Sequence, residues 1–134
     1  MSGSLSLVLP FPPSVNACWR TVRGTMIISE KGRAFRANAI AAVYQQLRKR
    51  PVAIEENVSV VVKMYPPTNH RRDIDNFLKA PFDALTYANV WKDDKQVRHV
   101  DIRWCEVVKG GRFEIEIRPL NAELEKILWA TNGY

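Results

Sequence analysis

The strongest constraint on the fold is the run of alternating apolar residues at positions 57–65. One side of this run is entirely apolar, and Val61 adds apolar character to the other side. The residues of the first side are Val58, Val60, Val62 and Met64. A period of two is typical of a β-strand, and the apolar character that Val61 adds to the second face indicates an interior strand. The chain is therefore expected to contain a sheet in which this segment is an interior strand.

Other regions predict further strands. Residues 4–9 carry leucines at every second position and end at a proline-rich stretch, which stops a strand. Residues 18–28 predict a hairpin or an irregular pair of strands that turns at Arg23-Gly24. Near the end of the chain, residues 98–107 and 112–118 predict two more strands. The Gly-Gly pair between them predicts that these two strands form a hairpin with each other.

Two segments carry apolar residues at helical spacing. The first begins after Ser29, which can cap a helix N-terminus, and extends to about Lys49. The second follows Arg72, and its apolar positions are Ile74, Phe77, Leu78, Pro81, Phe82 and Leu85. Pro81 is expected to kink this helix or to confine its regular part to the later turns. The order of elements predicts an α+β fold, an α/β two-layer arrangement in which helices pack on a mixed β-sheet.

The composition suits one compact domain. The chain has 134 residues, of which 46% are hydrophobic and 25% are charged, and we expect residues 1–134 to form a single domain with 121–134 as a C-terminal helical tail. An amphipathic pattern at 122–129 predicts the helix of this tail. No apolar run approaches the roughly 20 residues of a membrane span, and no Lys or Arg precedes Arg20 to begin a signal peptide. A soluble, cytoplasmic protein that does not bind a membrane is expected.

The charge is positive and unevenly distributed. The net charge is +6; residues 1–72 carry 11 basic and 3 acidic side chains, whereas residues 73–134 carry 9 basic and 11 acidic ones. A basic protein favours an anionic partner such as a nucleic acid. The chain therefore combines a basic half with a half that holds most of the carboxylates.

The acidic residues that follow Arg72 have two interpretations. In the first, Asp73 caps a helix and Asp75 pairs with Lys79, four residues further on the same helical face. In the second, Asp73 and Asp75 bind a divalent cation, because Mg²⁺ prefers carboxylate oxygens. The sequence pattern alone leaves both open.

A second acidic pair, Asp93-Asp94, could add a carboxylate if the fold returns its loop to the start of the helix. Taken alone, this pair favours a solvated turn over a metal ligand. With a metal present, Lys79 could stabilise negative charge on a phosphate that is being hydrolysed. Basic residues flank both acidic groups and are candidates for DNA binding, since carboxylates by themselves would repel the phosphate backbone. These basic residues are Arg71, Arg72, Lys92 and Lys95.

Residues 71–97, RRDIDNFLKAPFDALTYANVWKDDKQV, resemble the signature of the RusA family of Holliday-junction resolvases. The shared pattern is R-D-x-D-N, a lysine, D-A-L and W-x-D-D-x-Q-V. Residues 9–36 resemble the family's opening P-P-S-x-N and S-x-x-G segments, and Lys109-Gly110-Gly111-Arg112 is similar to a hairpin near its end. The resemblance covers nearly the whole chain up to about Leu120.

The resemblance implies a small homodimeric, Mg²⁺-dependent endonuclease, often carried by prophages, that resolves four-way DNA junctions by paired symmetric nicks in recombination and repair. It implies that Asp73, Asp75 and Asp94 are the catalytic, metal-binding aspartates and that Lys79 is a functionally important lysine. Asp93 is an additional candidate ligand, and Mn²⁺ is an alternative to Mg²⁺. Two symmetric scissile phosphates suit a twofold dimer, for which the first strand and the last helix are the expected contacts.

We therefore expect a crossover junction endodeoxyribonuclease. One alternative is a non-catalytic, basic DNA-binding module in which the acidic residues only cap a helix. Another is a metal-dependent nuclease that acts on other branched or single-stranded nucleic acids. Metal dependence of cleavage distinguishes the first alternative, and a panel of substrates distinguishes the second.

Overall fold

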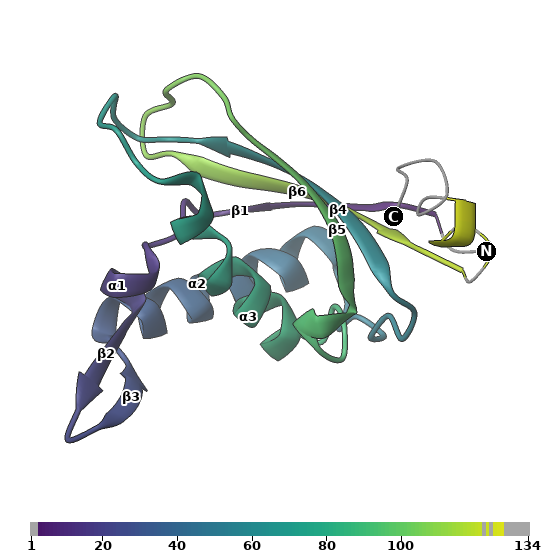
Figure 1. The fold of residues 1–134 in the computed structure, drawn as a ribbon, viewed down its shortest axis with the longest axis horizontal. Helices are drawn as coiled ribbons and strands as arrows, with labels where there is room; N and C mark the ends of the chain where they lie inside the picture. The colour runs from purple at the N-terminus through teal and green to yellow at the C-terminus, as the bar shows by residue number, and fades with distance from the viewer. Residues whose placement is uncertain (1–2, 122, 124, 128–134) are drawn as a thin grey trace.

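The computed structural model describes residues 3–121, 123 and 125–127. A four-stranded mixed sheet has the order β1-β6-β4-β5, and a separate two-stranded ribbon pairs β2 with β3. Helices α2 and α3 lie against one face of the sheet, and the ribbon projects beyond them at the lower left of the view (Figure 1). The α+β architecture expected from the order of elements is confirmed.

The interior strand is β4, Val58–Tyr65, as predicted. It pairs antiparallel with β6, Arg112–Pro119, and parallel with β5, Val97–Trp104. The parallel pairing follows from the helical crossover between β4 and β5, because a crossover returns the chain in the same direction. The first strand, β1, Leu5–Leu9, pairs antiparallel with β6 and forms one edge of the sheet.

The predicted hairpin between the last two strands is wrong. β6 pairs with β1 and β4, and β4 lies between β5 and β6. The connection follows the end of β4 instead: the Cys105 amide donates to the Met64 carbonyl (2.8 Å) and the Val108 amide to the Pro66 carbonyl (2.9 Å). These bonds hold the chain against the end of β4. The turn at Lys109-Gly110-Gly111 then leads to β6, on the other side of β4. The Gly-Gly pair therefore marks a turn, not strand pairing.

Gly111 is required at its position by space as well as by conformation. Its φ is +68°, and a Cβ atom there would lie 2.8 Å from Cβ of Phe11 and 3.0 Å from Cδ of Pro67. Any side chain would displace the loops that meet at this end of the sheet. The glycine thus allows residues from three parts of the chain to pack closely beside the candidate site.

The first long helix, α2, spans Glu30–Leu47 and begins as predicted. Ser29 is its N-cap, and the Ser29 hydroxyl accepts a hydrogen bond from the Gly32 amide (3.0 Å). Phe35, Ala39 and Val43 are buried on one side of the helix, at the spacing that the sequence pattern indicates. The helix ends at Leu47, close to the predicted Lys49.

The second predicted helix is not continuous. Ile74–Phe77 form a 3₁₀ turn, η1, and the regular helix α3 spans Lys79–Tyr87. Pro81 is the third residue of α3, where a missing N–H removes no intrahelical hydrogen bond. Asp75 therefore does not lie on a continuous helical face with Lys79, and the expected i, i+4 arrangement is wrong; the regular part is confined to the later turns, as anticipated.

The ribbon forms as predicted. After the short helix α1, Val15–Cys18, β2 spans Trp19–Val22 and β3 spans Thr25–Ile28. Arg23 and Gly24 form the turn with φ values of 52° and 78°. Positive φ at both central residues is the pattern of a two-residue hairpin turn whose twist matches the strands.

The predicted tail helix is partly described. Glu123 and the segment 125–127 are helical, and the other positions of 122–129 lie outside the described residues. No helix in the described part of the chain is both long and apolar enough to cross a membrane.

Candidate active site

The carboxylates of Asp73 and Asp75 are exposed and make no hydrogen bond or ion pair within the described residues. Asp73 occupies the N-cap position of η1, but its side chain accepts no capping hydrogen bond. No ion pair joins Asp75 to Lys79 in the described part of the chain. The helix-capping interpretation is therefore not supported, and both carboxylates can accept a cation or a donor from outside the chain.

Aromatic side chains hold the turn that carries these carboxylates. The ring of Phe77, in η1, lies 5.5 Å from the ring of Phe11 and 5.7 Å from the ring of Trp104, measured between centroids. The centroids of Phe11 and Trp104 are 6.3 Å apart. Phe11 follows β1, and Trp104 ends β5. This cluster fixes η1 at the end of the sheet, because offset and edge-on ring pairs add to the energy of burial.

Arg72 holds the preceding loop. Its guanidinium donates to the carbonyl oxygens of Thr68 and His70 (both 3.0 Å) and to the Thr68 hydroxyl (2.6 Å), and it lies 5.7 Å from the Phe11 ring centroid. Arg71, in contrast, is exposed and has no such contact within the described residues. Of the two arginines predicted to bind DNA, Arg71 presents a free guanidinium and Arg72 organises the loop.

Lys79 begins α3, and its ammonium lies 5.1 Å from the ring centroid of Trp19. It forms no ion pair with a described residue. The face of an aromatic ring attracts a cation without neutralising it. Trp19 therefore restrains the direction of this side chain and leaves its positive charge available.

The second acidic loop is anchored from both ends. Before it, Trp91 is fully buried, and its indole N–H donates to the Thr86 hydroxyl (2.8 Å). After it, the side-chain amide of Gln96 donates to the carbonyl oxygens of Ile54 (2.8 Å) and Glu56 (2.7 Å). These bonds fix the loop between α3 and β5, so that its carboxylates have defined positions.

Asp93 and Asp94 have different environments. The Asp93 carboxylate accepts the Lys95 amide (2.8 Å) in a capping box of the 3₁₀ turn η2, Asp94–Gln96, and this bond lowers the pKa of Asp93. Burial raises the pKa of Asp94, and the neighbouring Asp93 raises it further, while the positive charge of Lys79 opposes the shift. Asp93 is thus committed to capping, whereas Asp94 lies within the electrostatic reach of Lys79.

An ion pair joins helices α2 and α3. Arg36 of α2 donates to Asp83 of α3 at 2.7 Å, and its guanidinium lies 3.9 Å from the ring centroid of Tyr87. The Nε atom of Arg36 is buried and has no hydrogen-bond partner in the described part of the chain. Asp83 also acts on Asp94, whose pKa its negative charge raises. The pair joins the two helices next to Lys79 and Asp94.

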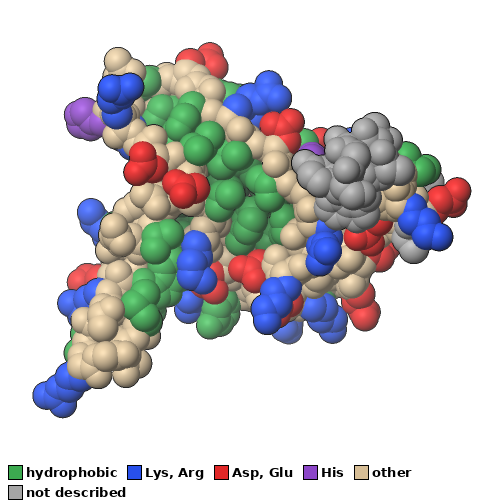
Figure 2. All heavy atoms as spheres, viewed as in Figure 1, with side chains coloured by type: hydrophobic (Ala, Val, Ile, Leu, Met, Phe, Trp, Pro, Cys, Tyr) green, Lys and Arg blue, Asp and Glu red, His purple; other side chains and the backbone are tan. Residues whose placement is uncertain are grey.

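The structure brings together only part of the predicted site. Asp94 is near Lys79 and Asp83, whereas Asp73 and Asp75 lie on the turn that precedes α3. No group of three or more His, Cys, Asp or Glu side chains that could hold a metal ion occurs among residues 3–121, 123 and 125–127. Figure 2 shows acidic side chains at the left of the molecule over η1 and a basic one at the tip of the ribbon. Lys92 and Lys95 are exposed beside the second acidic loop.

Several residues that build the site were not among the predicted ones. Gln96 had a local signal, since a Gln three residues after Asp93 is the sequence pattern of a capping box. Trp19 and Arg36 had none, because each acts on a residue that only the fold brings near.

Asp73, Asp75 and Lys79 have no ion pair among the described residues, and exposed basic side chains precede them at Arg71 and flank the second acidic loop. Together these residue types define a class of site. Carboxylates can hold a cation, and lysine and arginine can bind and neutralise a phosphodiester. The arrangement is that of a hydrolase for nucleic-acid phosphodiesters.

Comparison with known proteins identifies the family. Residues 10–118 match the family described as endodeoxyribonuclease RusA. The chain is 38% identical over 118 residues to the crossover junction endodeoxyribonuclease RusA of Shigella sonnei, which covers 88% of this chain and 97% of that protein. The corresponding protein of Escherichia coli is 37% identical over 118 residues with the same coverage, and that of Enterobacteria phage 82 is 38% identical over 117 residues, 87% of this chain and 96% of its own. The chain belongs to the RusA family of endodeoxyribonucleases, as its motifs predicted.

Proposed function

We propose that this protein is a crossover junction endodeoxyribonuclease, which resolves four-way DNA junctions by hydrolysing one phosphodiester in each of two symmetric strands. Support comes from the family match over residues 10–118 and from the names of the relatives. The observation that carries the proposal is the pair of exposed carboxylates of Asp73 and Asp75, which have no ion pair or capping hydrogen bond within the part of the chain that the structure describes. In a DNA-binding module that kept Asp73 and Asp75 only to cap a helix, their side chains would make capping hydrogen bonds.

Asp73, Asp75 and Asp94 are the proposed ligands of Mg²⁺, with Mn²⁺ as an alternative. The donor set fits, because all three offer carboxylate oxygens and the first two have no competing partner among the described residues. Mg²⁺ is usually held by one or two protein carboxylates together with water and substrate phosphate, so a pocket of three gathered side chains is not required. When bound, the metal would acidify a water molecule and offset phosphate charge.

The chain's own basic residues bind and orient the DNA. Arg71 contacts the backbone near the scissile phosphate, and Arg72 keeps the loop in place through its bonds to Thr68 and His70. Lys79, directed by the ring of Trp19, stabilises the negative charge that develops on the phosphate or on the leaving oxygen. Lys92 and Lys95 extend the contact along the strand.

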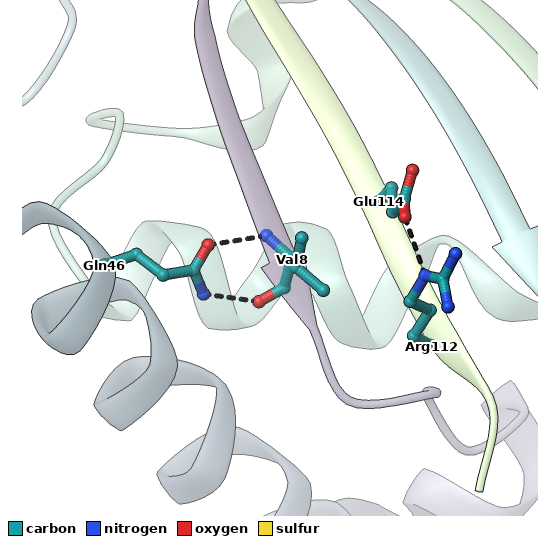
Figure 3. A network of polar contacts seen from close by, with 4 residues as sticks. All are labelled: Val8, Gln46, Arg112 and Glu114. Carbon is teal, nitrogen blue, oxygen red and sulfur yellow. Dashed lines mark hydrogen bonds and ion pairs between the residues drawn. The ribbon is translucent and has the colours of Figure 1, made fainter. Parts of the chain in front are cut away.

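A twofold dimer is part of this proposal, since two symmetric nicks require two copies of one site. The outer edge of β1 is partly occupied at Val8, whose amide donates to Gln46 Oε1 (2.8 Å) and whose carbonyl accepts from Gln46 Nε2 (2.6 Å) (Figure 3). A partner strand could pair there only after displacing Gln46 of α2. The open face of the sheet beside β1 is the better surface for the second copy, and sedimentation analysis that found only monomers at working concentration would reject the dimer.

The decisive experiment is cleavage of a mobile four-way junction beside a linear duplex of the same sequence, with Mg²⁺ or EDTA. We expect symmetric nicks in the junction only, lost with EDTA and with Asp94→Asn. Tight junction binding without cleavage by the unmodified protein, over a range of pH and divalent metals, would instead identify a binding module. Equal cleavage of other branched substrates would reject junction selectivity.

A further inference from the structure

Beyond Trp19 at its base, the proposed chemistry uses no residue of the β2–β3 ribbon. Residues 19–28 contain Arg20 and Arg23 but no acidic residue. The ribbon projects away from the sheet, past the N-terminal end of α2 (Figure 1). A projecting segment with positive charge and no carboxylate is suited to an anionic partner.

The base of the ribbon is firmly attached to the body. The Ser29 amide donates to the Cys18 carbonyl (2.8 Å), and the Ser29 hydroxyl donates to the Ala17 carbonyl (2.6 Å). Gly32 of α2 packs so closely that a Cβ atom would lie 2.5 Å from the Cys18 carbonyl oxygen. Arg33 donates to the Ile28 carbonyl at 3.0 Å. The ribbon is thus a fixed arm whose position relative to α2 is determined by packing at its base.

The outer part of the ribbon is exposed and partly apolar. Met26 is 60% exposed and Val22 is 42% exposed. The Met26 sulfur accepts a hydrogen bond from the Thr21 hydroxyl at 3.3 Å. Burying an exposed methionine against another surface is favourable, and its flexible, polarisable side chain suits an aromatic base.

One face of the ribbon is continuous with the candidate active site. The register pairs Trp19 with Ile28 and Thr21 with Met26. Directly paired residues, and alternate residues along a strand, share a face, so Met26 lies on the same face as Trp19. Because Lys79 lies over the Trp19 ring, DNA held against this face would lead toward Lys79.

We propose that the β2–β3 ribbon enters the junction at its branch point, where Met26 packs against the bases and Arg20 and Arg23 bind the flanking phosphates. This inference rests on the proposed junction substrate. A two-stranded ribbon fits the width of the major groove, and apolar side chains that insert at a base step unstack it and kink the DNA. Unstacking costs least where base stacking is already interrupted, as at a branch point. The rigid base then sets the distance between the branch point and Lys79.

The first test uses a junction with 2-aminopurine at the branch point, in EDTA so that no strand is cut. Binding of the unmodified protein should raise the fluorescence, because the base becomes unstacked. Met26→Ala should abolish the rise and weaken junction binding about tenfold, while binding to linear duplex changes less than about twofold. Val52→Ala is the matched control, since Val52 is 88% exposed and lies outside the ribbon. Unchanged fluorescence and affinity with Met26→Ala, or an equal loss with Val52→Ala, would overturn the inference.

The second test replaces Arg20 and Arg23 together by alanine and measures binding at several salt concentrations. The slope of log K against log salt should fall in magnitude by about two, and Arg50→Ala, an exposed arginine after α2, should leave it unchanged. An unchanged slope with the ribbon variant would overturn the phosphate contacts. Cleavage by the unmodified protein in Mg²⁺ is scored separately: its absence rejects the proposed nuclease, whereas the fluorescence and salt results decide the role of the ribbon.

Discussion

Charged side chains on the regular helices and strands differ from those on the turn before α3. Arg36 of α2 pairs with Asp83 of α3, and Arg112 pairs with Glu114 within β6, each at 2.7 Å. On η1 and at its N-cap, the carboxylates of Asp75 and Asp73 have no ion pair within the described chain. Paired charges contribute to the fold, whereas unpaired charges near one another raise its energy unless a ligand compensates them. The contrast indicates which charges serve folding and which serve the substrate and the metal.

The largest expected effect is on the unpaired carboxylates. Asp73→Asn, Asp75→Asn or Asp94→Asn should each lower the single-turnover cleavage rate ~10³-fold or more, because a proposed metal ligand is lost. Junction affinity should stay equal or rise, since removing a negative charge also removes repulsion of DNA. Cleavage of a labelled junction and gel-shift binding measure the two quantities.

Asp101→Asn is the matched control, because Asp101 is an exposed aspartate of β5 whose Oδ2 lies 3.7 Å from Nη2 of Arg103. This variant should cleave the junction at the rate of the unmodified protein. If Asp73→Asn lost binding and thermal stability together with cleavage, Asp73 would belong to the charges that serve folding.

A smaller loss is expected when the unpaired lysine is changed. Lys79→Met should lower cleavage about a hundredfold, as expected when one charge-stabilising donor is removed. Trp19→Leu should produce a smaller loss in the same direction, whereas Trp19→Phe keeps an aromatic face and should retain most of the rate. Rates of all single and double variants form a double-mutant cycle.

In that cycle, Trp19→Leu should have little further effect once Lys79 is methionine. Fully additive losses would show that Trp19 acts independently of Lys79. Unchanged melting temperatures would separate this positioning role from a role in the fold.

The anchors of the second acidic loop connect the two regions. Gln96→Ala removes three side-chain hydrogen bonds, two donated to the carbonyl oxygens of Ile54 and Glu56 and one accepted from the Asp93 amide, and should reduce the free energy of unfolding by about 1–3 kcal/mol. Cleavage should also fall, because Asp94 loses its defined position. Urea denaturation and cleavage rates measure both, and Gln45→Ala, on the exposed side of α2, is the control. A variant that was destabilised but fully active would show that the loop position is not needed for catalysis.

The smallest effect concerns proton binding at Asp94. In the metal-free protein its pKa lies above the usual range, mainly because of burial, with Asp93 and Asp83 adding to the shift and Lys79 opposing it. Asp83→Asn should therefore lower the pKa of Asp94, and Lys79→Met should raise it. A raised pKa keeps the Asp94 carboxyl protonated up to a higher pH, and a protonated carboxyl binds a metal poorly. On acidification, the Lys79→Met variant should therefore lose metal binding at a higher pH than the unmodified protein does. Carboxyl NMR titration measures the direction, and a shift of the opposite sign in either variant would contradict the electrostatic arrangement.

Local patterns predicted the elements well and their pairing less well. The interior strand, the turn at Arg23-Gly24 and the Ser29 cap were confirmed. The prediction that residues 98–107 and 112–118 pair as a hairpin was wrong, because a Gly-Gly pair predicts a local turn of the backbone and not which strands pair. The continuous helix from Ile74 was wrong as well: the rings of Phe11 and Trp104 hold Phe77 in a 3₁₀ turn, and neither is near it in sequence.

The sequence by itself determined the interior strand, the Ser29 cap, the turn at Arg23-Gly24, which residue types carry the chemistry, and, through its motifs, the family. Only the tertiary structure decided that β4 separates β5 from β6, that Arg72 holds a loop while Arg71 has no such contact among the described residues, and that Trp19 directs Lys79. The physical reason is one of range. Periodicity and capping depend on neighbours within about one helical turn, whereas strand order and side-chain partners depend on which distant segments bury their apolar faces together.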